Sequence, residues 1–103
     1  MTKNTGIKIR QLRAIGHKLK PVVTISQAGL TDGVSLELDR ALRDHELIKV
    51  KIPSKSSGPR KKIIDEICKA SSAKIVQELG NVLLLMRRTE NPNPKLSNLI
   101  RII

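Results

Sequence analysis

The chain has 103 residues, enough for one domain with a modest core and too few for a second. Lysine and arginine total 20 against 9 acidic residues, which gives a net charge of +11 and points to a polyanionic partner. The sequence contains no phenylalanine, tyrosine or tryptophan. It therefore lacks the usual platform for stacking single-stranded bases, and an RNA recognition motif is excluded.

A membrane partner is also disfavoured. The longest unbroken apolar run, residues 82–86, is far shorter than the roughly 20 residues of a spanning helix, and the first residues show no apolar segment typical of a signal peptide. Cys68 is the single cysteine, so no internal disulfide can form, and it is expected to be a buried small hydrophobe. We expect a monomeric protein of the reducing cytoplasm.

In chain order, the pattern first predicts a helix over residues 7–19. Its apolar positions at helical spacing are Ile9, Leu12, Ile15, Gly16 and Leu19. A second face carries Arg10, Arg13, His17 and Lys20. Pro21 ends this helix, residues 22–25 read as a β-branched strand, and residues 26–29 read as a tight loop.

The next helix is predicted over residues 32–45, with Thr31 as its N-cap. A strand over residues 47–52 follows, whose alternation places Lys49 and Lys51 on one face. After a loop at residues 53–59 come a helix at 60–71 and strands at 74–79 and 82–87, joined by a type II′ turn at Gly80-Asn81. Residues 1–90 are the expected domain, and residues 91–103 form a tail that we expect to be mostly extended or mobile.

This order, α-β-α-β-α-β-β, predicts a two-layer α+β fold with a four-stranded mixed sheet. Two right-handed βαβ units make three of the strands parallel, and the final hairpin adds an antiparallel strand.

The acidic residues are unevenly distributed. None precedes Asp32, none lies between Glu46 and Asp65, and five of the nine fall within residues 32–46. We expect basic surfaces on the first helix and around the second strand, where each cation that neutralises a phosphate releases counterions. The loop before Thr31 is a second candidate: free amides at a helix N-terminus bind anions, and Gly29 would let a phosphate approach. On local sequence alone, Gly29 could equally serve only the turn.

Three stretches resemble the CRM domain (chloroplast RNA splicing and ribosome maturation), in its stand-alone bacterial YhbY-like form. They read Leu19-Lys20-Pro21-Val22-Val23, Ala28-Gly29-Leu30-Thr31-Asp32-Gly33-Val34 and His45-Glu46-Leu47-Ile48-Lys49-Val50-Lys51. The resemblance covers roughly residues 6–90. It implies a fold like the C-terminal domain of translation initiation factor three, with the last strand inserted between the second and third. It also implies binding to RNA, especially precursors of the large ribosomal subunit, through a KH-like GxxG loop and a basic first helix.

The chain departs from the family pattern at two places. Ser26 replaces the first glycine of the loop, and Gln27 or Ala28 replaces its middle basic residue. On the last strand, Met86 stands where the family has tyrosine, while Arg87 is kept. Both changes favour plain electrostatics over loop contacts and stacking.

Catalysis is not indicated, because two isolated histidines, no zinc-ligand spacing and no phosphate-binding Walker loop leave no recognisable active site. We predict an RNA-binding assembly factor of the large ribosomal subunit, without catalytic residue, metal, cofactor or small-molecule substrate. A general RNA or DNA chaperone and a protein-interaction module that presents the acidic second helix are the alternatives. The expected RNA-binding residues are Arg10, Arg13, His17, Lys18, Lys20, Ser26, Gln27, Ala28, Gly29, Lys49, Lys51 and Arg87.

Overall fold

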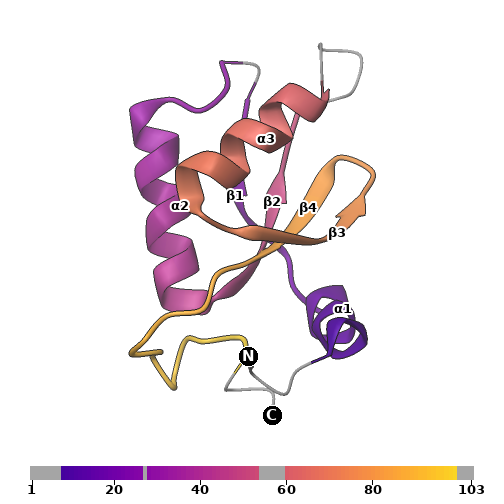
Figure 1. Cartoon of the computed structure of the whole chain (residues 1–103), viewed down its shortest axis with the longest axis vertical. Helices are drawn as coiled ribbons and strands as arrows, with labels where there is room; N and C mark the ends of the chain where they lie inside the picture. Colours follow the sequence, from indigo (N-terminus) through magenta and orange to yellow (C-terminus); the bar gives the residue numbers. More distant parts are fainter. Residues whose placement is uncertain (1–7, 27, 54–59, 100–103) are drawn as a thin grey trace.

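The computed structural model describes residues 8–26, 28–53 and 60–99. These form three helices and four strands (Figure 1). The helices are α1 (Ile9–His17), α2 (Asp32–His45) and α3 (Arg60–Ser71), and the strands are β1 (Pro21–Thr24), β2 (Leu47–Lys51), β3 (Lys74–Leu79) and β4 (Val82–Met86). The predicted order is confirmed, and element ends fall within about two residues of those expected.

The four strands form one mixed sheet in the order β1-β2-β4-β3. Strands β1 and β2 are parallel, whereas β4 runs antiparallel to both β2 and β3. The expected insertion of the last strand between the second and third is therefore confirmed. Gly80 has a φ of 57° at the first position of the β3–β4 hairpin, as a type II′ turn requires.

Helices α2 and α3 cover one face of the sheet, because alternate strand residues point toward them. From β2 this face receives Ile48 and Val50, and from β4 it receives Leu83 and Leu85, all fully buried. The helices contribute Leu38, Leu42, Ile64 and Ile67 to the same cluster. This is the larger of the two hydrophobic clusters, and it fixes α2 and the loop before it against the end of β1.

Helix α1 packs on the opposite face of the sheet, apart from α2 and α3 (Figure 1). Leu12 and Ile15 contact a cluster that includes Leu84 of β4. Gly16 allows the close approach, since a Cβ atom there would lie 2.5 Å from Cδ2 of Leu84. Ile9, predicted to be apolar and inward, is 53% exposed, because it points about 120° around the helix from Ile15.

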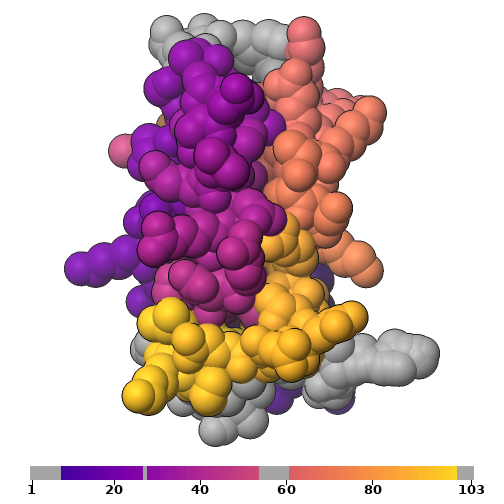
Figure 2. Space-filling view, turned by 90° about the vertical axis from the view of Figure 1, so that its left-hand side faces the viewer, coloured from indigo at the N-terminus to yellow at the C-terminus, as the bar shows by residue number. Residues whose placement is uncertain are grey.

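The segment after β4 folds back under α2 instead of extending away, as the space-filling view shows (Figure 2). Leu99 is 1% exposed and joins the cluster beneath α1, and Ser97 and Asn98 are buried beside it. This differs from the mostly extended or mobile tail that the sequence predicts, because Leu99 packs in the same cluster as Leu12 and Ile15. Residues 100–103 lie outside the described part of the chain.

Candidate nucleic-acid interface

Helix α1 presents a row of cationic side chains to solvent. Its buried residues occupy one side, and Arg10, Arg13 and His17 are all exposed on the other. The Lys8 amide donates to Gln11 Oε1 at 2.9 Å at the start of the helix, and the Lys18 amide donates to the Ile15 carbonyl at 3.1 Å at its end. Both ends of this short helix are thus fixed by local hydrogen bonds, and the row is held on a rigid element.

Two lysines of β2 extend this surface on the same side of the sheet. Lys49 and Lys51 alternate with residues that face α2 and α3, so they lie on the α1 side; Lys49 is half-buried and Lys51 is exposed. Pro21 pairs with Lys49, which brings the exposed Lys20 alongside. The structure therefore places the predicted helix and strand cations on the same side of the sheet.

We call these residues the basic face: Arg10, Arg13, His17, Lys18, Lys20, Lys49 and Lys51. Within residues 8–26, 28–53 and 60–99, the ion pairs of the molecule lie elsewhere. Asp39 pairs with Arg43 and Arg87, and Glu46 lies beside Arg88. The cations of the basic face have no acidic partner among the described residues, so their charge is available to a ligand.

The loop between β1 and α2 adjoins this surface, since the Ile25 amide donates to the Lys51 carbonyl at 2.8 Å. The loop is closed on itself: the Gly29 amide donates to the Ser26 carbonyl at 2.9 Å, and the Ala28 amide donates to Ser26 Oγ at 3.2 Å. Gly29 has a φ of 80°, which favours glycine. Two of the amides predicted to hold a phosphate thus already have internal acceptors, and the phosphate contact stays a prediction. Gln27 lies outside the described residues.

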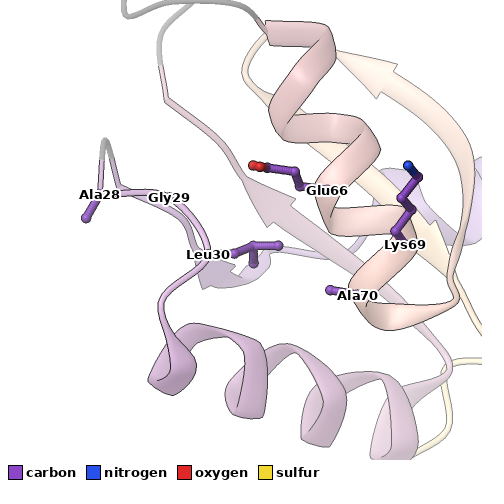
Figure 3. A pocket seen from close by; sticks show the side chains of 6 residues that line it. All are labelled: Ala28, Gly29, Leu30, Glu66, Lys69 and Ala70. Atoms are coloured by element: carbon purple, nitrogen blue, oxygen red, sulfur yellow. The ribbon is translucent and has the colours of Figure 1, made fainter.

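A shallow groove separates this loop from α3 (Figure 3). It has a volume of about 580 Å³, and its lining is Ala28, Gly29, Leu30, Glu66, Lys69 and Ala70. Glu66 and Lys69 are both exposed on α3, and their opposite charges sum to zero. The groove therefore lacks the net positive charge of the basic face.

Arg87 does not join the basic face. Its guanidinium donates to Asp39 Oδ1 at 2.9 Å, to the Asp39 carbonyl at 3.0 Å and to the Ser71 carbonyl at 2.9 Å. Its side chain is 21% exposed. Arg43 and, after it, Arg87 hold the pKa of the Asp39 carboxyl below its ordinary value of 3.8. Arg87 thus joins β4 to α2 and α3, and its role as an RNA contact stays a prediction.

Sequence reasoning missed the role of Glu46, a fully buried carboxylate at the junction of α2 and β2. It adopts a φ of 62° and caps α2 by donating its amide to the Leu42 carbonyl at 2.9 Å. Its carboxylate accepts from the Thr89 amide at 2.8 Å and from Ser97 Oγ at 2.6 Å. Nothing in the sequence around Glu46 distinguishes it from a solvated acid, since both partners are more than 40 residues away.

The neighbours of Glu46 bind the same C-terminal segment. The Asn98 amide donates to the His45 carbonyl at 2.9 Å, and Asn98 Nδ2 donates to the Leu47 carbonyl at 2.6 Å. His45 Nδ1 lies 2.9 Å from the Leu96 carbonyl. The His45-Glu46-Leu47 part of the sequence motif therefore has a structural function, which is to attach residues 96–98 to the domain.

Among the described residues, no three His, Cys, Asp or Glu side chains are grouped so that they could hold a metal ion. Burial, and secondarily Asp65, raises the pKa of the half-buried Cys68 thiol. In the part of the chain that the structure describes, none of the helices has the length and apolar character needed to cross a bilayer.

The chain is similar to several known proteins. A probable RNA-binding protein of Pseudomonas aeruginosa is 46% identical over 92 residues, which cover 89% of this chain and 88% of the relative. An RNA-binding protein of Haemophilus influenzae is 40% identical over 79 residues, covering 77% of this chain and 80% of the relative. The solution structure of a hypothetical protein of Staphylococcus aureus superposes with a TM-score of 0.68 at 25% identity and covers 84% of this chain and 91% of its own. The model of the CRS1/YhbY (CRM) domain matches residues 5–87, and the chain therefore belongs to the CRS1/YhbY (CRM) domain family.

Proposed function

We propose that this protein binds RNA through the basic face and acts in the assembly of the large ribosomal subunit. The observation that carries the RNA-binding proposal is the group of cations on the α1 side of the sheet that have no acidic partner among the described residues. Exposed cations also lie on α3, but α3 carries the exposed acids Asp65 and Glu66 as well, whereas α1 carries no acid. When such a surface neutralises phosphates, the nucleic acid releases the counterions condensed on it, and this release is a large source of affinity for a nucleic-acid backbone.

The names of the relatives support RNA over DNA as the partner, since the proteins of P. aeruginosa and H. influenzae are both named as RNA-binding. The large-subunit precursor comes from the family resemblance. On this proposal the protein is a monomer in the cytoplasm, and it positions or protects a segment of precursor ribosomal RNA without changing it chemically.

The decisive experiment is sedimentation of a cell extract at low salt. We expect the protein to travel with precursors of the large subunit and to return to the top of the gradient after salt is raised or after nuclease treatment. A protein that stays at the top at low salt, while the ribosomal particles are intact, contradicts the ribosomal proposal. Binding of purified protein to ribosomal RNA fragments then shows whether the RNA-binding part stands alone.

The alternative of a general RNA or DNA chaperone predicts equal competition by ribosomal RNA fragments and duplex DNA of the same length. The alternative of a protein-interaction module has less support, because Asp39 of α2 is already bonded to Arg43 and Arg87. Helix α2 therefore offers fewer free acids to a basic partner than its sequence indicates. A partner complex that survives nuclease treatment would favour the protein-interaction module.

A further inference from the structure

The cations of the basic face lie on two layers of the molecule. On α1, the axial distance from Arg10 to His17 is about 10.5 Å at the rise of an α-helix. On β2, Lys49 and Lys51 are about 6.6 Å apart along the strand. Because α1 packs on the face of the sheet that carries Lys49 and Lys51, the two rows lie on the same side of the molecule, one on the helix and one on the sheet.

This arrangement suits a double helix better than a single strand. Single-strand binders combine a cationic groove that follows one backbone with aromatic side chains that stack on the bases. This chain has no aromatic residue, and the groove beside the loop contains both Glu66 and Lys69. A double-helical RNA instead presents phosphates of two strands on either side of a wide, shallow minor groove, and it is recognised by shape and by contacts to phosphates and 2′-hydroxyls.

An exposed hydroxyl lies next to these cations. Thr24 pairs directly with Lys51 in the parallel β1–β2 ladder, so the two exposed side chains point from the same face of the sheet. A threonine hydroxyl can both donate and accept a hydrogen bond, as a ribose 2′-hydroxyl does. Lys51 and Thr24 therefore place a phosphate-binding and a ribose-binding group side by side.

We propose that the RNA bound by this face is double-helical, with α1 and the β2 lysines contacting phosphates of the two strands and Thr24 contacting a 2′-hydroxyl. The proposal rests on the proposed function, because it specifies which RNA the basic face binds. It adds Thr24, which lies outside the residues that sequence reasoning selected.

The test is a titration of the full chain with three probes of equal length: a 20-base-pair RNA hairpin stem, an unstructured single-stranded RNA and a DNA duplex of the same sequence as the stem. At about 0.1 M salt we expect the hairpin stem to bind about tenfold more tightly than the single strand, with a steeper salt dependence, since each contact contributes about 0.9 to the slope for a duplex and about 0.7 for a single strand.

Two variants sharpen the test. Thr24→Val keeps the shape and β-branching of the side chain, and we expect it to reduce the preference for duplex RNA over duplex DNA about fivefold, the factor that corresponds to a hydrogen bond worth about 1 kcal/mol. The matched control is Ser35→Ala, which also removes one hydroxyl but lies in α2, on the opposite side of the sheet from the basic face. Thr31→Val would be unsuitable, because Thr31 Oγ1 caps α2.

The outcomes separate the two proposals. Single-stranded RNA that binds as tightly as the hairpin stem overturns the double-helix proposal and leaves RNA binding intact. A preference for duplex RNA that survives Thr24→Val unchanged overturns the assigned 2′-hydroxyl contact. If neither RNA binds at low salt, the proposed function itself is wrong.

Discussion

Reversal of two charges on α1 tests the basic face directly. Arg10 and Arg13 are exposed and lack acidic partners among the described residues, so the double variant Arg10→Glu/Arg13→Glu removes two phosphate contacts with little effect on packing. For a duplex, each contact contributes about 0.9 to the slope of log affinity against log salt. The slope should therefore fall by about 1.8, and affinity at 0.1 M salt should fall about sixtyfold or more, since the new glutamates also repel phosphate.

The fold should tolerate these changes. Arg10 lies in the first turn of α1, where an acidic side chain interacts favourably with the helix dipole. A charge-matched control is Arg40→Glu/Lys69→Glu, which changes two exposed cations on α2 and α3, on the other side of the sheet. Thermal unfolding followed by circular dichroism checks that both double variants are folded.

The assay is a fluorescence titration of a labelled RNA hairpin at salt concentrations from about 50 to 200 mM. The ratio of the affinities at the two ends of this range should be about twelve times smaller for the α1 variant than for the unaltered protein, as a slope reduced by about 1.8 requires. The control should keep most of the original slope. An α1 variant with an unchanged slope, or a control that loses as much as the α1 variant, would refute the assignment of the interface.

Further predictions concern the fold and the loop. Gly16→Ala should destabilise the protein by about 1–3 kcal/mol in urea unfolding, because its Cβ would overlap a buried leucine, whereas the control Gly33→Ala, with open space around it, should be neutral or stabilising. Because the pKa of Asp39 is lowered, its carboxylate stabilises the fold above a pH of about 3.8, and this contribution is lost as the pH falls through the lowered pKa. Asp39→Asn should therefore remove this part of the acid sensitivity when unfolding is measured from about pH 2 to pH 6. Arg87→Lys keeps the charge but not the three hydrogen bonds, so it should lower the unfolding temperature while leaving the RNA salt slope unchanged. Ser26→Gly should strengthen RNA binding in the same titration, because it frees the Ala28 amide, which now donates a hydrogen bond to Ser26 Oγ; weaker binding would show that the hydroxyl itself contacts RNA.

The elements and their order follow from local sequence signals. Alternation along β2 correctly separates the residues that face α2 and α3 from Lys49 and Lys51, because the side chains of a strand alternate with a period of two. Helical spacing predicts which side of α1 is apolar, but Ile9 lies at the edge of that side, about 120° around the helix from Ile15, and is exposed. How closely α1 approaches the sheet depends on a tertiary contact, the packing of Gly16 against Leu84.

The candidate interface is predictable to the extent that it is local. The exposed row on α1 follows from residue spacing alone, and the structure places Arg10, Arg13 and His17 in solvent. The roles of Arg87 and Glu46 are not local. Arg87 is bonded to a residue 48 positions earlier and Glu46 to one 51 positions later. A charged side chain has no periodicity that reveals such a partner.

The placement of these bonded acids bears on how a chain with a net charge of +11 maintains a folded domain. Asp39 is paired with Arg43 and Arg87, and Glu46 lies beside Arg88 and accepts a hydrogen bond from Ser97 of the C-terminal segment. Both acids therefore stabilise the fold and do not neutralise the cations of α1. The repulsion that remains lies on an exposed surface, where water and salt screen it to a small cost. A bound polyanion removes this repulsion, so the same cations that slightly destabilise the free protein favour the complex. An α1 whose cations have no acidic partner among the described residues is therefore what a backbone-binding protein requires, since acids placed beside α1 would improve stability and weaken the affinity for phosphate.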